Sequence, residues 1–281
     1  HGHVDHMLVS AGSGLATLGT PSSPGVPKDF AKNTIVLPYN DLDAVKKVFE
    51  KERSKIAAII VEPVAGNMGT IVPTKSFLQG LRTVCNKNKS LLIFDEVISG
   101  FRLTYGGYQD LIGIKPDLTT LGKIIGGGFP IGAVGGKKKI MDCLSPEGSI
   151  YQAGTLSGNP VCVAAGIATL KALKSQKPYT KLGRQTEKLC DGISDILNEK
   201  SIPHTINRIG AMFTLFFNPD PVKNFDGAAA SDTERYGEYF KQMLEAGIYV
   251  PPSQFETNFV STAHTQKDFD KTLKAFRKLN L

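Results

Sequence analysis

The sequence predicts an α/β protein with a mostly parallel central sheet, followed by a smaller α+β domain. Early in the chain, short apolar runs alternate with segments in which apolar residues recur at helical spacing. The runs at 56–61 and 91–94 are continuously apolar, which is typical of parallel strands buried on both faces. After residue 178, longer amphipathic patterns replace this rhythm. We therefore expect a large domain over 1–176 and a small domain over 177–281.

The elements expected in the large domain follow in chain order. Residues 1–32 are rich in Gly, Ser and Pro, which predicts a long irregular loop. An Ala-rich apolar helix at 161–173 should be largely buried. The other elements expected here are strands at 33–39, 56–61, 91–94 and near 131–134, and helices at 41–54, 75–87 and near 137–143.

The small domain should contain both helices and short strands. A polar stretch with a proline at 174–178 marks its boundary. The elements expected after it are helices at 179–200, 232–246 and from Gln266 onward, and strands near 204–208, 211–217, Ile248 and Phe259.

Composition indicates an ordinary globular protein, since 41% of its 281 residues are apolar and 21% are charged. The four cysteines form no Cys-x-x-Cys pair, which argues against a disulfide framework and suits the reducing cytoplasm. No apolar run is long enough to span a membrane. The net charge of +7 is spread along the chain with few aromatics nearby, so we expect no nucleic-acid partner.

The stretch from Leu91 to Gly128 carries the main chemical signal. Asp95 comes at the carboxyl end of an apolar strand, and Lys123 lies between a glycine and two isoleucines, just before three glycines. An enzyme that uses pyridoxal 5'-phosphate needs a carboxylate for the pyridinium nitrogen and a lysine for the Schiff base. The apolar neighbours of Lys123 predict a side chain shielded from water. The plainer alternatives are a surface lysine and an Asp95 that caps a helix or forms a salt bridge.

Three segments together resemble a known family. They are Phe94-Asp95-Glu96-Val97, Gly122-Lys123-Ile124-Ile125-Gly126-Gly127-Gly128 and Gly154-Thr155-Leu156-Ser157-Gly158-Asn159-Pro160. They look like the class III branch of the pyridoxal phosphate aminotransferases of fold type I, the aspartate-aminotransferase fold. The resemblance implies a homodimer that acts on a small-molecule substrate and alternates between pyridoxal and pyridoxamine 5'-phosphate.

Further segments resemble the aminomutases of this family, which are isomerases that move an amino group within one molecule. They are His1-Gly2-His3, Ala11-Gly12-Ser13-Gly14, the segment 61–69 and Pro252-Ser253-Gln254-Phe255-Glu256. The competing prediction is a class III ω-aminotransferase with a separate amino donor and acceptor. A third is a chain that keeps the fold without catalysis.

The resemblance implies a role for each residue around the cofactor. Lys123 would hold it and move protons, Asp95 would pair with its ring nitrogen, and Val97 would pack on one ring face. Gly154 and Thr155 would bind the phosphate of the cofactor in the neighbouring subunit. Alternatively, Thr155 could cap the helix that follows Pro160.

The remaining implied roles concern the edges of the site. Glu62 and Asn67 would line it, and Glu256 would lie near the cofactor. Residues 3–31 would form a gating loop, with Gly12, Ser13 and Gly14 near its turn. The alternatives are a structural hydrogen-bond acceptor for Glu62, a turn former for Asn67, and ordinary polar surface for Ser13 and Glu256.

The resemblance also implies that some parts of the site precede His1. These are the main phosphate-binding segment, the aromatic residue on the other ring face and the arginine for the substrate carboxylate. We therefore expect this chain to be the later part of a longer protein.

A different pattern occupies the first six residues. His1-Gly2-His3-Val4-Asp5-His6 resembles the metal-binding motif of metallo-β-lactamase-type hydrolases. No strand precedes it, and only His204 and His264 remain downstream to complete a site with two metal ions. We therefore expect no metal site.

Overall fold

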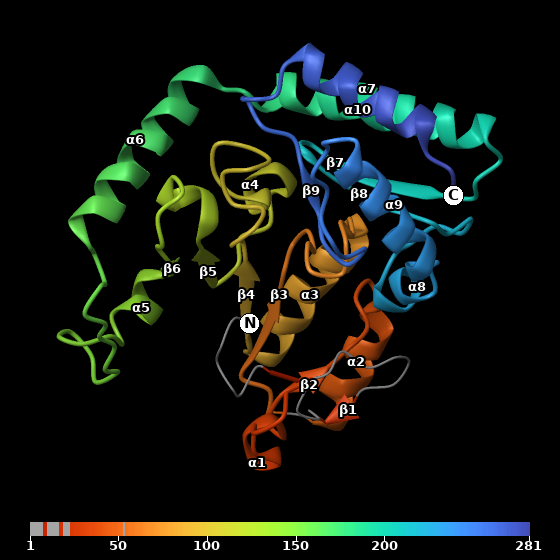
Figure 1. The fold of residues 1–281 in the computed structure, drawn as a ribbon. Helices are drawn as coiled ribbons and strands as arrows, with labels where there is room; N and C mark the ends of the chain where they lie inside the picture. The colour runs from red at the N-terminus through yellow and green to blue at the C-terminus, as the bar shows by residue number, and fades with distance from the viewer. Residues whose placement is uncertain (1–7, 10–16, 19–22, 53) are drawn as a thin grey trace.

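A computed structural model of the chain describes residues 8–9, 17–18, 23–52 and 54–281 (Figure 1). The larger sheet has the strand order β3 (Ala58–Val61), β4 (Leu91–Asp95), β5 (Leu118–Leu121) and β6 (Ala133–Gly136). Strands β3, β4 and β5 are parallel, and β6 pairs antiparallel with β5. The expected mostly parallel sheet is therefore confirmed. Its three parallel strands bring their carboxyl ends to one side of the sheet, where open α/β sheets bind ligands.

Strand β5 is the element of this sheet that the sequence pattern does not predict. Its two threonines break the apolar run, and the segment becomes a strand through its pairing with β4 on one side and β6 on the other. Asp117, just before it, fixes the register because its carboxylate accepts from the backbone N–H of Leu92 at 2.7 Å and from Arg82 at 2.8 Å. Lys137 pairs with the same carboxylate.

Helices α2 (Leu42–Lys51) and α3 (Lys75–Asn88) confirm two expected helices. The Asp41 side chain caps the first of them and the Thr74 side chain caps the second. Their apolar sides share a core with β4, whose members include Val45, Phe49, Phe77, Leu78, Leu81, Leu92 and Phe94. This core anchors the strand that carries Asp95.

Helix α6 (Pro160–Gln176) forms where expected, but the prediction that it is largely buried is wrong. Only Cys162 and Gly166 are buried, while Val161 is 57% exposed and Ile167 is 49% exposed. The helix touches the 3₁₀ turn η2 (Lys123–Gly126) along one narrow strip, since a Cβ built on Gly166 would lie 2.3 Å from the carbonyl oxygen of Ile125. Figure 1 shows α6 on the outer side of the sheet, on its way to the helices at the top.

Two further strands near the N-terminus differ from expectation. The strand expected at 33–39 is reduced to β2 (Ile35–Val36), because Pro38 and Asn40, with φ +66°, turn the chain away. It pairs antiparallel with β1 (Thr17–Leu18) in a separate small sheet. Strand β3 is not buried on both faces, since Ile60 is 42% exposed at the edge of the four-stranded sheet.

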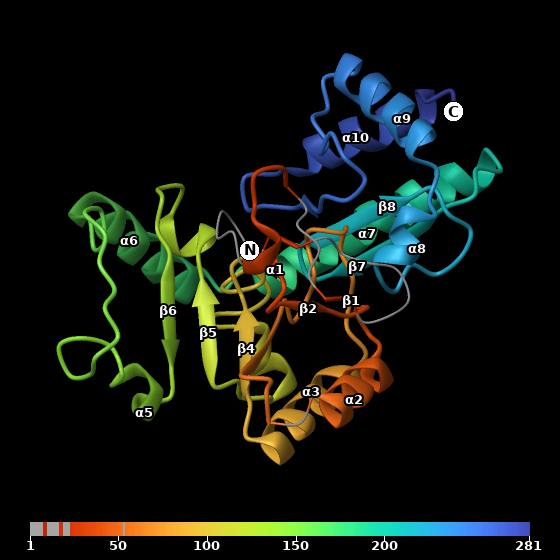
Figure 2. The same ribbon diagram turned by 90° about the horizontal axis from the view of Figure 1, so that it is seen from below.

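The C-terminal third is built on the antiparallel sheet β7 (Thr205–Ile209), β8 (Met212–Phe216) and β9 (Asn258–Phe259). Helices α7 (Tyr179–Glu199), α9 (Thr233–Glu245) and α10 (Gln266–Lys278) pack on it, as Figures 1 and 2 show. The expected α+β arrangement is confirmed. The expected strand at Ile248 is not, because Gly247 has φ +73° and the Ile248 N–H closes the end of α9 on Met243.

Short helices complete the described part of the chain. They are α1 (Lys28–Ala31), α4 (Tyr108–Ile112), α5 (Lys138–Met141) and α8 (Phe225–Ala229). Of these, only α5 corresponds to a helix that the sequence predicts. No helix in the described part combines the length and the apolar character needed to cross a membrane.

Candidate active site

Three charged residues lie at the carboxyl ends of neighbouring parallel strands. Glu62 follows β3, Asp95 ends β4, and Lys123 lies two residues after β5. The strand register places Val61 beside Phe94, and Asp95 beside Thr120. The charges of Asp95 and Lys123 both act on the pKa of Glu62, which indicates that the three groups share one electrostatic environment.

Asp95 is half-buried, and only one of its two carboxylate oxygens accepts hydrogen bonds from described residues. Its Oδ1 accepts from the backbone N–H of Val97 at 3.1 Å and from the hydroxyl of Thr120 at 3.2 Å. No described residue donates to its Oδ2. The bond to Val97 closes a local turn of the kind that Asp often forms, and residues 97–100 are a turn and not a helix, so the helix-capping alternative is wrong. The free oxygen can still accept a hydrogen bond from a ligand.

Lys123 starts the turn η2 in a left-handed conformation, with φ +46°. Its neighbours Gly122 and Ile125 are buried, but the lysine side chain itself is exposed. The prediction of a shielded lysine is therefore wrong for the described chain, because the turn directs the side chain outward from the apolar packing. The amine forms no ion pair or hydrogen bond with any described residue.

Val97 lies against this lysine turn. A Cβ built on Gly122 would come within 3.2 Å of Val97 Cγ1, so the backbone just before Lys123 passes close to the valine side chain. Gly127, with φ +58°, comes closer still to α6, where its Cβ would lie 2.3 Å from Thr169 Oγ1 and 3.0 Å from the carbonyl oxygen of Ala165. The glycines on both sides of Lys123 thus allow the turn to fit between the β4 segment and α6.

Glu62 and Asn67 belong to one tight turn. Glu62 Oε2 accepts from the backbone N–H of Gly66 at 3.0 Å, and Oε1 accepts from Asn67 Nδ2 at 3.1 Å. Burial raises the pKa of Glu62, and these two hydrogen bonds act in the opposite direction. Glu62 therefore acts as the structural hydrogen-bond acceptor that was the alternative for it, and its role towards a cofactor stays a prediction.

The segment that carries Glu256 lies beside this turn. The Phe255 carbonyl accepts from the Gly69 N–H at 2.7 Å, and the Thr257 hydroxyl donates to the Gly66 carbonyl at 3.2 Å. The Glu256 side chain is exposed, and its charge acts on Tyr236, whose pKa is raised first by burial and then by this carboxylate. The fold thus brings the C-terminal third of the chain to Asn67.

Gly154 and Thr155 are not brought to the other site residues of their own chain. They lie in an exposed segment that Figure 1 shows beyond α5, away from the carboxyl ends of β4 and β5. The capping alternative for Thr155 is wrong, because Asn159 Oδ1 accepts from the first backbone N–H groups of α6.

Several residues singled out in the sequence lie outside the described residues. They include Gly12, Ser13 and Gly14 of the expected gating loop and the motif from His1 to His6. In the part of the chain that the structure does describe, no three His, Cys, Asp or Glu side chains are grouped to hold a metal ion.

Sequence reasoning missed Thr120, which orients Asp95. The available signal was weak, since a threonine three residues before Lys123 becomes meaningful only once β5 is known to pair with β4.

Comparison with known proteins identifies the family. The model of the class-III aminotransferases matches residues 1–278. The chain belongs to this family. It is 54% identical over 275 residues to glutamate-1-semialdehyde 2,1-aminomutase 2 from Brevibacillus brevis, covering 98% of this chain and 64% of the relative. It is 52% identical to glutamate-1-semialdehyde 2,1-aminomutase from Aquifex aeolicus, covering 99% of this chain and 65% of that protein. The chain thus spans about two thirds of the length of these relatives.

Solved structures agree with the family. An ω-transaminase from Sphaerobacter thermophilus superposes with a TM-score of 0.90 at 31% identity, covering 99% of this chain and 65% of that one. A glutamate-1-semialdehyde aminomutase from Pseudomonas aeruginosa in complex with PMP superposes with a TM-score of 0.83 at 25% identity, covering 99% of this chain and 63% of that one. The expected aspartate-aminotransferase-like fold class of the pyridoxal phosphate enzymes is confirmed.

Proposed function

We propose that this chain carries the reaction centre of a glutamate-1-semialdehyde 2,1-aminomutase, an isomerase that converts glutamate-1-semialdehyde to 5-aminolevulinate on the route to porphyrins. The observation that supports this most strongly is the pairing of Asp95 and Lys123 at adjacent strand ends, in a chain 52–54% identical to curated proteins of that name. The identity of 52–54% to curated aminomutases over nearly the whole chain favours amino transfer within one molecule.

The residues fit pyridoxal 5'-phosphate and its pyridoxamine form. Asp95 Oδ2 is free to accept a hydrogen bond from the protonated ring nitrogen, while the Val97 N–H and the Thr120 hydroxyl hold Oδ1 in place. The Lys123 amine is free to form the covalent link, and Val97 lies beside the lysine turn where it can contact a ring. When bound, the cofactor supplies an electron sink that makes a carbon–hydrogen bond next to the amine acidic.

Lys123 Nζ is then the group placed to move a proton between the substrate carbon and the cofactor carbon. Two features of the chain suit this task. The amine forms no ion pair or hydrogen bond with the described residues, so it is free to reach a ligand, and the turn between Gly122 and Gly127 fixes its backbone. Glu62 and Asn67 form the neighbouring wall, and Glu256 approaches from the C-terminal third.

A homodimer would complete the site. The exposed segment before α6 is unusually apolar: Tyr151 is 83% exposed, Leu156 is 74% exposed and Ile150 is 54% exposed. Apolar patches of this kind mark interaction surfaces. In a dimer, this segment would be covered, and Gly154 and Thr155 would reach the phosphate in the neighbouring subunit. Sedimentation of the wild type and of Leu156→Asp tests this, since a monomeric wild type would contradict it.

The division into a cofactor domain up to residue 176 and a small domain from 177 belongs to the same proposal. It is supported by a core whose buried members all lie from Leu182 onward, and by the left-handed Lys177 and Pro178 between α6 and α7. The four cysteines are free, which suits a reducing cytoplasm.

The covalent link is tested first, with a readout that does not require turnover. The chain is mixed with pyridoxal 5'-phosphate, reduced with borohydride and digested for mass spectrometry. In the wild type, we expect a pyridoxyl group on Lys123. In Lys123→Ala, we expect no pyridoxyl group on the peptide that contains residue 123. Labelling of another lysine alone would overturn the assignment.

The reaction itself is tested by 5-aminolevulinate formation from glutamate-1-semialdehyde without any added amino acceptor. Product formation under these conditions supports the aminomutase. If turnover instead requires an added keto acid, the ω-aminotransferase alternative is correct.

A further inference from the structure

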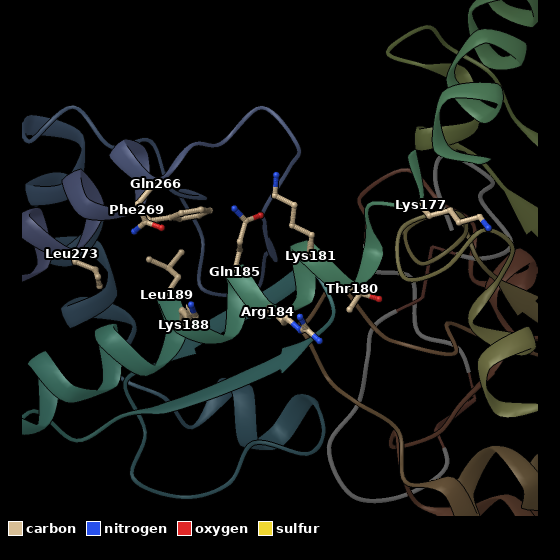
Figure 3. A pocket seen from close by; sticks show the side chains of 10 residues that line it. All are labelled: Lys177, Thr180, Lys181, Arg184, Gln185, Lys188, Leu189, Gln266, Phe269 and Leu273. Atoms are coloured by element: carbon tan, nitrogen blue, oxygen red, sulfur yellow. The ribbon is translucent and has the colours of Figure 1, made fainter. Parts of the chain in front are cut away.

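A groove with a cationic rim lies between helices α7 and α10, far along the chain from the proposed reaction centre. It encloses about 480 Å³, and none of the proposed site residues lines it. Figure 3 shows Lys181, Arg184 and Lys188 following one another along α7, with Phe269 of α10 facing Leu189. The groove therefore combines a basic helix edge with an apolar floor.

The three cations lie on one face of α7. Positions 181, 184 and 188 are spaced by three and four residues, which places them on neighbouring turns of one helix face. At 1.5 Å per residue, Lys181 and Lys188 are about 10 Å apart along the helix axis. Lys177, at the end of α6, extends the row in the direction of the N-terminus of α7.

These cations are exposed, and none of them forms an ion pair or hydrogen bond with a described residue. Two of the nearby acidic residues are already engaged, and Asp191, three residues after Lys188 on α7, does not line the groove. Glu187 pairs with Arg208 at 2.8 Å, and Asp270 accepts from Gln266 at 2.9 Å. No Asp or Glu lines the groove, so its positive charge is not balanced from within.

We propose that this groove docks an acidic amphipathic helix of a partner protein. Carboxylates spaced by three and four residues on such a helix would match the cations of α7. An adjacent row of leucines would cover the floor formed by Leu189, Phe269 and Leu273. The docked helix would add a third layer to the pair α7 and α10.

Other anionic ligands match the groove less well. The cations form a row of about 10 Å and do not converge on one point, as a single phosphate requires. The aromatic ring of Phe269 is only 7% exposed, so it offers no platform for stacked nucleic-acid bases. Leu189, also 7% exposed, is recessed in the floor, so it cannot insert into a lipid surface.

Fluorescence anisotropy with a labelled synthetic helix tests the proposal. The probe carries glutamates at i, i+3 and i+7 with leucines beside them, and it is titrated with the whole chain. We expect saturable binding that weakens as salt is added, because screening reduces the attraction between exposed charges. The double variant Lys181→Glu/Lys188→Glu should weaken binding by at least about tenfold, since two attractive contacts become repulsive.

Two matched controls make the result specific. Lys274→Glu/Lys278→Glu introduces the same charge change on α10 at exposed positions that do not line the groove, and it should bind the probe nearly as the wild type does. A peptide of the same composition with its leucines moved to the opposite face should bind about tenfold more weakly. Circular dichroism confirms that each variant is folded.

Several results would overturn the proposal. These are no binding of the probe, equal losses in the two double variants, or equal binding of the rearranged peptide. A single-stranded oligonucleotide or an anionic vesicle that binds more tightly than the probe, and is lost in Lys181→Glu/Lys188→Glu, would assign the groove to a different class of ligand.

Discussion

The hydroxyl of Thr120 should contribute measurably to cofactor affinity, although it cannot itself touch the reacting carbon atoms. In Thr120→Val, Asp95 Oδ1 loses the hydrogen bond at 3.2 Å and keeps only the Val97 N–H at 3.1 Å. Hydrogen bonds to charged groups are worth roughly 1.5–3 kcal/mol, and this one is long and half-exposed, so we take about 1 kcal/mol. Since 1.4 kcal/mol is a factor of ten, the dissociation constant for pyridoxal 5'-phosphate should rise about fivefold.

The assay is an absorbance titration of the chain with pyridoxal 5'-phosphate, and the neighbouring threonine provides the control. Thr119 lies on the same strand, and its hydroxyl exchanges hydrogen bonds with Gln109 instead of Asp95. Thr119→Val should therefore bind the cofactor like the wild type. If the two valine variants have the same affinity, or if Thr119→Val is the weaker binder, Thr120 does not position Asp95 and the reasoning fails.

Lys123→Ala should abolish turnover and leave the unfolding temperature nearly unchanged, because its side chain is exposed and without an ion pair in the described chain; residual activity above a few per cent would point to another lysine. Burial raises the pKa of the Asp117 carboxyl, but the Leu92 N–H, Lys137 and Arg82 together outweigh burial and hold this pKa below its ordinary value of 3.8. Its stabilisation is therefore complete above pH 3.8 and is lost as the pH falls below that value. Asp117→Asn should lower the free energy of unfolding, measured with urea at neutral pH, by about 2 kcal/mol. It should also weaken the fall of this free energy at acidic pH, whereas Asp43→Asn, at an exposed ion pair, should do neither. Gly166→Ala should cost roughly 1–3 kcal/mol, because its Cβ would meet a carbonyl oxygen of the lysine turn at 2.3 Å. Gly183→Ala, whose nearest atom lies at 3.9 Å, should be neutral or stabilising, and equal losses in the two alanine variants would contradict this.

Local pattern was sufficient for the elements that carry their own signals. The capped helix after Asp41, the apolar strand at 91–95 and the long helix from Tyr179 all form where the sequence predicts them. The combination of an acid at a strand end with a lysine among glycines was also readable, because a pyridoxal phosphate enzyme needs a carboxylate and a lysine. The resemblance of the same motifs to the class III aminotransferases is confirmed by the family comparison.

Burial was the property that the local sequence pattern predicted least accurately. Helix α6 has an apolar composition on all sides, which predicts a buried helix, yet only a narrow strip of it meets the turn at Lys123. Strand β3 likewise has an exposed Ile60, because it lies at the edge of the sheet. Apolar character records what a segment can bury, whereas the amount that it does bury depends on which neighbours reach it.

The sequence by itself determined the chemistry available to this protein, namely a carboxylate at Asp95 where a predicted strand ends and an amine at Lys123 just before three glycines. Only the tertiary structure decided that they lie on adjacent strands, because β5 becomes a strand through its pairing with β4. The structure alone also linked Thr120 to Asp95, separated Thr155 from its own chain's site, and joined the segment of Glu256 to that of Asn67. The physical reason is that residue type and local spacing fix what a group can do, while long-range backbone pairing fixes which groups meet.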